Sequence, residues 1–194
     1  MTKIYFVRHG QAATGWGGAA DPELAEIGHV QAQKVANEIA THLDGQTAKI
    51  LTSPLLRCQD TAAPLAAKWG VEVIIEPRVR ELPSPMSDLT ARTDWLKRVM
   101  QGTWNELDND HQSQGTDFPA WRTGIIQALH DQVSEPAVII FSHFIAINVA
   151  YSEACKTEKV VGFQPDNCSV SIFETDGATL TCIETGRDAK TVVN

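Results

Sequence analysis

Residues 3–7 read KIYFV, and Arg8-His9-Gly10 follows them at once. A short run rich in apolar and β-branched residues is too short for a helix and is typical of a buried strand. A strand that ends in charged residues and glycine carries them at its carboxyl end. In open α/β sheets ligands bind at that edge. We therefore expect Arg8 and His9 to lie at a ligand site.

Short apolar runs alternate with segments of helical periodicity along most of the chain. Further strands are predicted at 49–51, 71–75, 137–141, 170–173 and 179–183, and helices at 24–43, about 54–69, about 92–100, 118–133 and 145–154. This alternation predicts parallel βαβ units with helices on both faces of one sheet. Asp176-Gly177 is a strong hairpin signal between the last two strands. The fold class is therefore α/β, a three-layer α/β/α sandwich whose central sheet is mostly parallel with an antiparallel strand near the C-terminus.

Length and local composition suggest one domain with one insertion. A chain of 194 residues fits a single domain over residues 1–194. Residues 83–118 are rich in proline, glycine and small polar residues, and outside the helix at about 92–100 we expect loop. Long irregular insertions often form lids or substrate walls, so we assign that role to this segment. Pro64 predicts a kink or a break in the helix that contains it.

The charge balance restricts the ligands. Sixteen basic against 24 acidic residues give a formal net charge of −8. Nucleic acids and anionic membranes bind proteins whose surface carries distributed positive charge, so we expect neither as a partner. No apolar run approaches the roughly 18 residues of a membrane span, and no leader is evident, which predicts a cytoplasmic protein. The four cysteines lack metal-site spacing and are expected to be buried free thiols.

Polar groups at other strand ends are expected to join Arg8 and His9. Ser53 follows the second strand, and Arg57 lies about one turn into the next helix. His143 follows the most apolar strand, and Glu81 follows the third. Guanidinium forks match phosphate oxygens, and a helix N-terminus adds a favourable dipole. The pattern therefore predicts a local anion site, suited to a phosphoryl group, in an otherwise acidic protein.

This combination resembles the histidine phosphatase superfamily, which is also called phosphoglycerate mutase-like. The motifs that carry the resemblance are RHGQ at 8–11, DPELAEIG at 21–28, TSPLLR at 52–57, REL at 80–82, SH at 142–143 and NCSV at 167–170. The tripeptide RHG alone is weak, but these motifs in this order are specific. The resemblance spans roughly residues 3–173 without the insertion.

The resemblance implies a phosphohistidine mechanism that needs no metal and no cofactor. The catalytic residues would be His9 as nucleophile, Glu81 as acid and base, and His143, while the phosphoryl ligands would be Arg8, Arg57, His143 and Gln11. A backbone carbonyl is expected to hold the second ring nitrogen of His9. The positive groups would collect around the charge of the transition state.

Two positions depart from the pattern of many family members. Gly15 stands where an asparagine often helps to hold phosphate, and Phe144 stands where a glycine follows the second histidine. The segment after Glu81 also differs, so the substrate is expected to differ. Three functions stay open: a phosphatase acting on a small phosphomonoester, which we favour; a phosphoglycerate mutase; and a non-catalytic phosphate-binding domain on the same scaffold. A homodimer is possible, and the sequence does not identify the substrate.

Overall fold

A computed structural model describes residues 1–15, 19, 21–113 and 115–189 of the chain. Its centre is one six-stranded sheet. The strands are β1 (Thr2–Arg8), β2 (Lys49–Thr52), β3 (Val73–Ile75), β4 (Ala137–Ser142), β5 (Val170–Thr175) and β6 (Leu180–Glu184). The spatial order is β3-β2-β4-β1-β5-β6. Strands β1 to β4 pair in parallel, whereas β5 is antiparallel to β1 and β6 to β5, as predicted.

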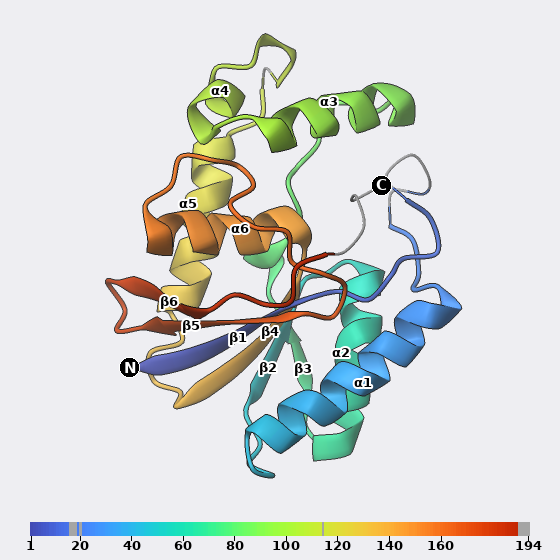
Figure 1. Cartoon of the computed structure of the whole chain (residues 1–194), viewed down its shortest axis with the longest axis vertical. Helices are drawn as coiled ribbons and strands as arrows, with labels where there is room; N and C mark the ends of the chain where they lie inside the picture. Colours follow the sequence, from blue (N-terminus) through green and yellow to red (C-terminus); the bar gives the residue numbers. More distant parts are fainter. Residues whose placement is uncertain (16–18, 20, 114, 190–194) are drawn as a thin grey trace.

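Helices cover both faces of this sheet. They are α1 (Glu26–His42), α2 (Leu56–Trp69), α3 (Leu89–Gln101), α4 (Trp104–Asp108), α5 (Phe118–His130) and α6 (Phe144–Cys155), with short 3-10 helices η1 (Pro77–Val79) and η2 (His111–Ser113). Figure 1 shows α1 and α2 on one side of the sheet and α5 and α6 on the other, with α3 and α4 beyond them. The predicted three-layer α/β/α architecture is therefore confirmed.

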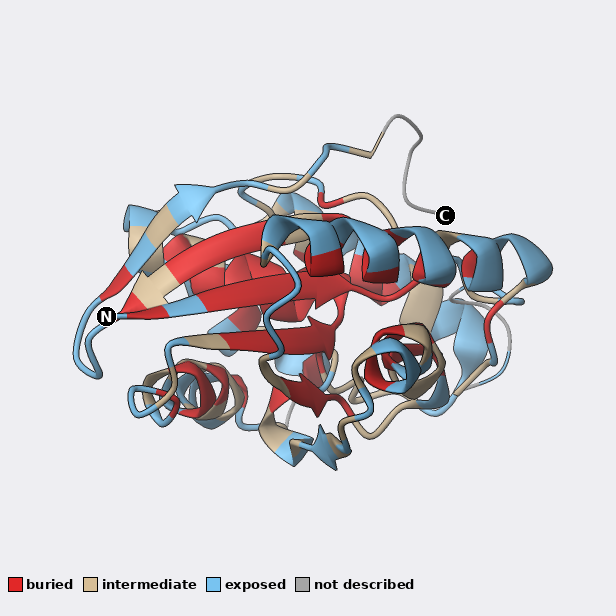
Figure 2. Ribbon diagram, turned by 90° about the horizontal axis from the view of Figure 1, so that it is seen from below, coloured by how far each residue is buried: buried red, intermediate tan, exposed pale blue. Residues whose placement is uncertain are grey.

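The sheet separates two hydrophobic cores. Tyr5 and Val7 pack toward α1 and α2, whereas Ile4 and Phe6 pack toward α5 and α6. The alternation follows from the period of two along a strand. Figure 2 shows the central strands largely buried, the edge strands β3 and β6 partly exposed, and the helices exposed on their outer sides. Each fully buried large apolar side chain contributes roughly 1.5–3 kcal/mol to stability, and so the strand ends are held on a rigid support.

The insertion is more ordered than predicted. Besides α3 it contains α4 and η2, where loop was expected. The Thr103 hydroxyl accepts from the N–H of Glu106, and the Glu106 carboxylate accepts from the N–H of Thr103, which forms a capping box. Trp104 and Leu107 are buried in the same core as α5. These two apolar anchors stabilise a helix that is too short to show a clear period in the sequence.

Other boundaries also differ from the prediction. The helix predicted from about residue 54 begins at Leu56, and it continues through Pro64 without a break. Leu65 and Ala66 are buried there, so packing against the sheet holds the helix together at the missing hydrogen bond. The third strand is shorter than predicted, because the N–H of Val71 still bonds to Ala66 in the turn that ends α2.

All four cysteines are free thiols. Cys58 and Cys168 are buried as predicted, whereas Cys155 is exposed and Cys182 is half-buried. The prediction of burial is wrong for Cys155 because it lies at the end of α6, where the chain turns outward at Lys156 in the left-handed conformation.

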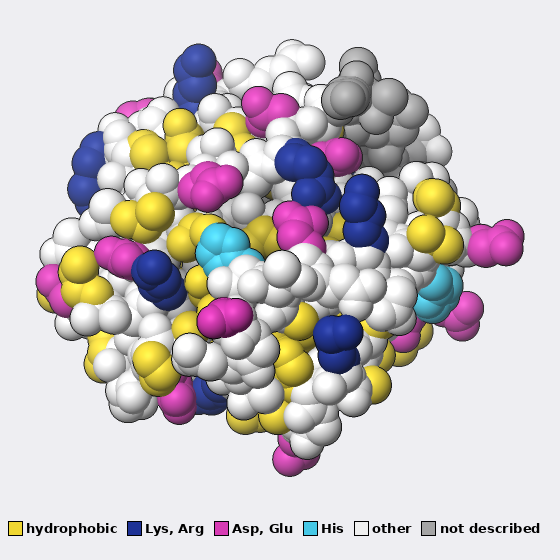
Figure 3. All heavy atoms as spheres, turned by 60° about the horizontal axis from the view of Figure 1, so that its bottom comes forward, with side chains coloured by type: hydrophobic (Ala, Val, Ile, Leu, Met, Phe, Trp, Pro, Cys, Tyr) yellow, Lys and Arg dark blue, Asp and Glu magenta, His cyan; other side chains and the backbone are white. Residues whose placement is uncertain are grey.

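The outer surface mixes charges of both signs. Figure 3 shows basic and acidic side chains interspersed among neutral and hydrophobic ones on the face drawn. Among the described residues, no helix has the length and apolar character needed to cross a bilayer. Five arginines, Arg8, Arg57, Arg78, Arg80 and Arg92, line the two cavities that are described below.

Candidate active site

Backbone pairing brings three strand ends to one point. Arg8 and Ser142 are register partners at the ends of β1 and β4. The N–H of His9 donates to the carbonyl of Ser142 at 2.9 Å, and the N–H of Ser53 donates to Phe141 at 2.9 Å. The residues that follow β1, β2 and β4 therefore leave the sheet side by side, as the strand-end argument predicts.

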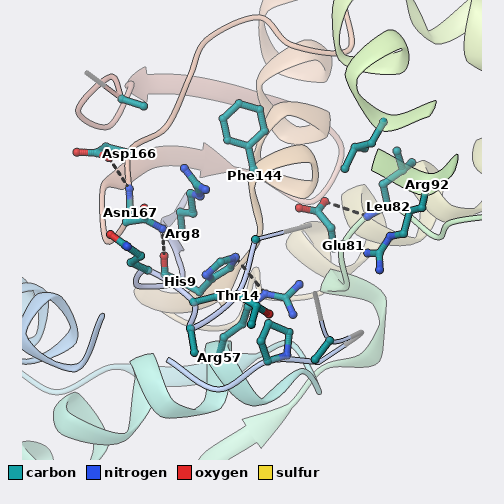
Figure 4. A pocket seen from close by; sticks show the side chains of 18 of the residues that line it. Arg8, His9, Thr14, Arg57, Glu81, Leu82, Arg92, Phe144, Asp166 and Asn167 are labelled. Carbon is teal, nitrogen blue, oxygen red and sulfur yellow. Dashed lines mark hydrogen bonds between the residues drawn. The ribbon is translucent and has the colours of Figure 1, made fainter. Parts of the chain in front are cut away.

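A cavity of about 430 Å³ opens over these strand ends. Figure 4 shows Arg8, His9, Arg57 and Glu81 directed toward it. Its wall also contains residues from α3, from the loop after β1 and from the segment before β5: Gln11, Thr14, Gly15, Arg92, Trp95, Leu96, Asp166 and Asn167. The insertion thus supplies one wall of the cavity through α3.

His9 is buried and held in one tautomer. Its Nδ1 lies 2.7 Å from the carbonyl oxygen of Gly10. Because a carbonyl only accepts, Nδ1 carries the proton and Nε2 keeps its lone pair. Burial lowers the pKa of His9 well below its ordinary value, and the charges of Arg57 and Arg8 lower it further. The ring is therefore neutral near pH 7 and has the form that a nucleophilic nitrogen needs.

Arg57 joins the two histidines. Its Nε–H donates to Nε2 of His9 at 3.2 Å, and its Nη2 donates to Nδ1 of His143 at 3.1 Å. Its Nη1 lies 3.6 Å from Oδ1 of Asp21. The same carboxylate accepts from the N–H of Leu56 at the start of α2. The guanidinium is thus fixed from three directions at the edge of the cavity.

His143 is fully buried next to this arginine. Since a guanidinium only donates, Nδ1 of His143 accepts, and its Nε2–H donates to Ser53 Oγ at 2.8 Å. Burial and the charge of Arg57 lower its pKa well below the ordinary value. Within the described part of the chain, His143 is not in the cavity wall. The structure places it in contact with Arg57 and Cys58, behind the surface that a ligand would touch.

Arg8 has one buried donor without a partner. Its Nη1 donates to the carbonyl of Pro165 at 2.9 Å, and its Cζ lies 5.1 Å from the centroid of the Phe144 ring. Its Nε is buried and makes no hydrogen bond to any described residue. An unpaired buried donor costs free energy unless a ligand satisfies it. Arg8 can therefore donate a hydrogen bond from Nε to a bound anion, and its guanidinium lies over the ring of Phe144.

Glu81 lies across the cavity, after η1. Its carboxylate accepts from the N–H of Leu82 at 2.9 Å and from the N–H of Ile145, in the first turn of α6, at 3.2 Å. Burial raises the pKa of Glu81, although these two hydrogen bonds and the charges of Arg57 and Arg8 oppose the shift. The raised pKa means that Glu81 keeps a proton to higher pH than an exposed glutamate does, which suits a general acid.

The loop around His9 contains further polar groups. Gln11 is exposed and lines the cavity, while its N–H donates to Oε1 of Gln31 at 2.8 Å. Asn167 donates from Nδ2 to the carbonyl of His9 at 3.0 Å. Thr14 lines the wall next to Gly15, which has no side chain to offer. Gln11 is thus near enough to the cavity to serve as a ligand.

Three contributors to the site were not predicted from the sequence as site residues. Asp21 fixes Arg57, Asn167 fixes the backbone of His9, and Arg92 enters from α3. Asp21 and Asn167 lie inside the quoted motifs, and that membership was their only signal. In the ranges that the structure describes, no group of three or more histidine, cysteine or acidic side chains is arranged to hold a metal ion.

Sequence comparison finds curated relatives for part of the chain. The probable phosphoglycerate mutase GpmB of Yersinia pestis (strain Pestoides F) is 36% identical over 118 residues, which cover 53% of this chain and 52% of the relative. The chain thus spans about half the length of the curated relatives it matches. This likeness concerns descent and leaves the activity open.

Solved structures share the fold over almost the whole chain. A phosphoserine phosphatase from Entamoeba histolytica superposes with a TM-score of 0.71 at 22% identity, covering 96% of this chain and 98% of that one. A putative alpha-ribazole-5'-P phosphatase from Escherichia coli gives 0.73 at 20% identity, with 98% of both chains covered. Bacillus stearothermophilus YhfR gives 0.75 at 19% identity, covering 97% and 98%.

The family profile covers both the strand ends and the insertion between them. The family model for the histidine phosphatase superfamily, branch 1, matches residues 4–187 of this chain. This range includes every residue of the cavity wall that is discussed above. The chain belongs to the histidine phosphatase superfamily.

Proposed function

We propose that this protein is a phosphatase that hydrolyses a small phosphomonoester through a phosphohistidine at His9. The observation that carries the proposal is the state of His9: Nδ1 is held by the Gly10 carbonyl at 2.7 Å, and Nε2 keeps a lone pair beside Arg57. Neutral imidazole is the nucleophilic form. The unpaired Nε–H of Arg8 supports a phosphoryl group as the bound anion.

In the first step, the lone pair of His9 Nε2 attacks phosphorus as the ester P–O bond breaks. The Nε–H of Arg57, which now contacts His9, turns to a phosphoryl oxygen, and Arg8 binds another. Glu81 gives its proton to the leaving oxygen, so that a neutral alcohol departs. The raised pKa of Glu81 supports this role.

In the second step, the Glu81 carboxylate takes a proton from water as the water oxygen attacks phosphorus. The P–N bond breaks, its electron pair returns to Nε2, and inorganic phosphate leaves. His143 would act here mainly through Arg57, because its Nδ1 accepts a hydrogen bond from Nη2 of Arg57. Gln11 would add a donor at the open side of the cavity.

We further propose that residues 83–118 act as a lid over this cavity. Arg92, Trp95 and Leu96 of α3 line its wall, so closure of α3 would change the space open to the leaving group. The rest of the insertion is tied down by ion pairs such as that between Arg122 and Asp108, at 2.7 Å. The lid would therefore select substrates by shape and charge.

A phosphoglycerate mutase is the second candidate, favoured by the relative of that name in Yersinia pestis. A mutase keeps the phosphoryl group and returns it to another hydroxyl of the same carbon skeleton. It would show interconversion of phosphoglycerates in the presence of a bisphosphoglycerate primer, with little release of inorganic phosphate.

The deciding experiment measures phosphate release from an aryl phosphate, with EDTA present, by the wild type and by His9→Ala. We expect release that depends on His9, and incorporation of a radiolabelled phosphoryl group in an acid-labile, base-stable form. His29→Ala is the matched control, because His29 is an exposed histidine of α1 outside the cavity. Equal release by wild type and His9→Ala would refute the proposal. Binding without turnover would favour a non-catalytic phosphate-binding domain.

A further inference from the structure

A second cavity, of about 480 Å³, adjoins the first. Arg57, Glu81, Leu82 and Arg92 line both, so the two spaces meet at the proposed general acid. Pro83, Ser84 and Trp121 form part of the remaining wall. A group bonded to the oxygen that Glu81 protonates therefore has room to extend past Glu81, away from His9.

This second cavity is strongly cationic. Its described wall contains four arginines, Arg57, Arg78, Arg80 and Arg92, and a single carboxyl group, that of Glu81. Such a concentration contrasts with the net charge of −8 for the whole chain. Two of these arginines are already engaged: Arg57 by both histidines and Asp21, and Arg78 by other acidic side chains.

Arg78 shows what a neutralised arginine looks like here. Its Nη2 lies 2.7 Å from Oε2 of Glu76, and its Nη1 lies 2.7 Å from Oδ2 of Asp131. Two further arginines near α3 and α4 are paired in the same way, since Arg98 pairs with Asp110 and Arg122 with Asp108. Pairing is thus the ordinary state of an arginine in this part of the protein.

Arg80 and Arg92 break that rule. Across the described residues, neither guanidinium makes an ion pair or a hydrogen bond; Arg80 is engaged only through its carbonyl, which accepts from Nε1 of Trp121 at 3.3 Å. Arg92 is half-buried, and Figure 4 shows its guanidinium reaching from α3 toward the segment of Glu81 and Leu82. The exposed Arg80 and the half-buried Arg92 both line the second cavity, and unpaired guanidinium groups in one wall can bind an anion.

We infer that the second cavity binds an anionic group on the leaving alcohol, held by Arg80 and Arg92. The identification of the bound group as part of the leaving alcohol rests on the proposed phosphatase function. The anion site itself is argued only from the residues that line the second cavity. The substrate would then be a phosphomonoester with a second negative group, a carboxylate or a further phosphate, several bonds from the ester oxygen. Glu81 would lie between the two anionic ends.

The test uses phosphonates, which cannot be hydrolysed, so that binding is measured apart from turnover. Two homologous series of increasing length are titrated into the wild-type protein by calorimetry: ω-carboxyalkylphosphonates and their ω-hydroxyalkyl counterparts. We expect the carboxylate to bind at least about tenfold more tightly at the length that spans both cavities, because a charge-assisted pair is about twice as strong as a neutral one. A terminal bisphosphonate series distinguishes a carboxylate site from a phosphate site.

Variants locate the effect. In Arg80→Gln/Arg92→Gln, the ratio of the two dissociation constants should fall to about one, and each single variant should lose part of it. Lys97→Gln is the matched control, since Lys97 is an exposed cation of α3 outside both cavities. Thermal unfolding confirms that each variant is folded.

The outcomes separate the two proposals. Equal binding of both series at every length, no binding of either, or a preference that survives the double variant would each overturn the anion site. A preference that depends on Arg80 and Arg92 would establish it, even if the wild type released no phosphate from an aryl ester. The latter result would overturn the phosphatase function alone.

Discussion

The Nε–H of Arg57 donates to Nε2 of His9 at 3.2 Å, so the guanidinium occupies the lone pair that would attack phosphorus. This contact does two things at once. It keeps Nε2 unprotonated, because the positive charge of an imidazolium ring would be repelled by the positive charge of Arg57. It also holds a cation where the phosphoryl oxygens would bind. The nucleophile and its electrostatic partner are therefore assembled before a substrate binds.

Arg57→Lys should lower kcat/KM by about 10²–10³-fold, because a lysine keeps the charge but cannot reach His9 and His143 together as the planar fork does. The pKa of His9 should rise toward its ordinary value wherever the lysine charge lies farther away. Steady-state kinetics and an NMR titration of His9 measure both effects. Arg122→Lys is the control, since Arg122 pairs with Asp108 outside the cavity. A rate loss as large in that control would contradict the assignment.

Glu81→Gln should separate the two chemical steps. Alkyl phosphates need a proton on the leaving oxygen and should react about 10²–10⁴-fold more slowly. An aryl phosphate with a good leaving group should still phosphorylate His9, but water would then lack a base, so a burst followed by accumulated phosphohistidine is expected. Rapid-quench kinetics detect it. Equal slowing of both substrates without a burst would count against Glu81.

The raised pKa of Glu81 also gives a pH dependence. In the wild type, the rate for alkyl phosphates should fall as the pH rises through this raised pKa, because the acid loses its proton. The free energy of unfolding should also decrease as the pH rises. The folded state favours the protonated carboxyl group of Glu81, so the stability linked to this proton is lost as the pH rises through the pKa of the folded state. Glu81→Gln should therefore need more urea for unfolding than the wild type at pH 7, and the difference should close in acid.

Buried neutral histidines should make the protein sensitive to mild acid. The pKa values of His9 and His143 are lowered in the folded state, by burial first and then by the charge of Arg57. Their contribution to stability is present above the ordinary histidine pKa of about 6.5 and is lost as the pH falls below it, because only the unfolded chain takes up the protons. In urea unfolding followed from neutral to mildly acidic pH, His9 and His143 should together contribute the uptake of about two protons. His9→Asn should remove about one of them.

Continuous apolar runs made the layers of the fold predictable. The apolar stretch 137–141, AVIIF, forms a strand whose residues 138–141 are buried, and residues 4–7 of the first strand are buried as well. The spatial order was beyond the sequence, because β4 inserts between β1 and β2, and local patterning carries no information on which parallel strands become neighbours. Helix α4 was missed although Thr103 and Glu106 spell a capping box, since five residues are too few for a periodic signal.

The site residues likewise fall into those that the sequence predicted and those that it did not. Arg8 and His9 lie at the end of β1, Arg57 lies in the first turn of the helix after β2, and Glu81 follows the 3-10 helix after β3, so short connections from the strands determine their positions. Contacts that loops create were not predictable: Asp21 reaches Arg57 across 36 residues of chain, and Arg92 reaches the cavity from an insertion whose path no pattern records. Neither Arg80 nor Arg92 was predicted to bind an anion: Arg80 directly precedes Glu81, Arg92 lies in α3, and only the fold brings them to the wall of one cavity.

Phe144 should matter through Arg8. Phe144→Leu keeps an apolar residue in the core but removes the ring 5.1 Å from the guanidinium carbon of Arg8. Cation–π attraction at a desolvated site is worth about 1–2 kcal/mol, so inorganic phosphate should bind about 5–30-fold more weakly. Phe173→Leu is the matched control, a fully buried phenylalanine that packs on Phe6 instead. Calorimetry with phosphate compares the two, and similar affinities in both variants would show that the ring only fills space.

Gly28 should not tolerate a side chain, because it lies against the backbone of another segment. It lies in the first turn of α1, where a Cβ would overlap the carbonyl oxygen of Gln11, and a Cβ on Gly10 would lie 2.7 Å from the carbonyl oxygen of Gly28. The two segments touch backbone to backbone, and the N–H of Ala25 donates to Gln11 at 2.8 Å in the same contact. Gly28→Ala must therefore push α1 away from the loop that follows His9.

This displacement should lower the free energy of unfolding by about 1–3 kcal/mol and reduce kcat/KM, because His9 and Gln11 lose their support together. Gly124→Ala is the control within a helix, since its Cβ would meet nothing closer than Cγ of Arg78 at 3.8 Å. Alanine is a better helix former than glycine, so that variant should gain up to about 1 kcal/mol. Urea unfolding of the two variants gives the comparison. A gain in both would mean that helix propensity outweighs the contact, and that α1 does not brace the nucleophile.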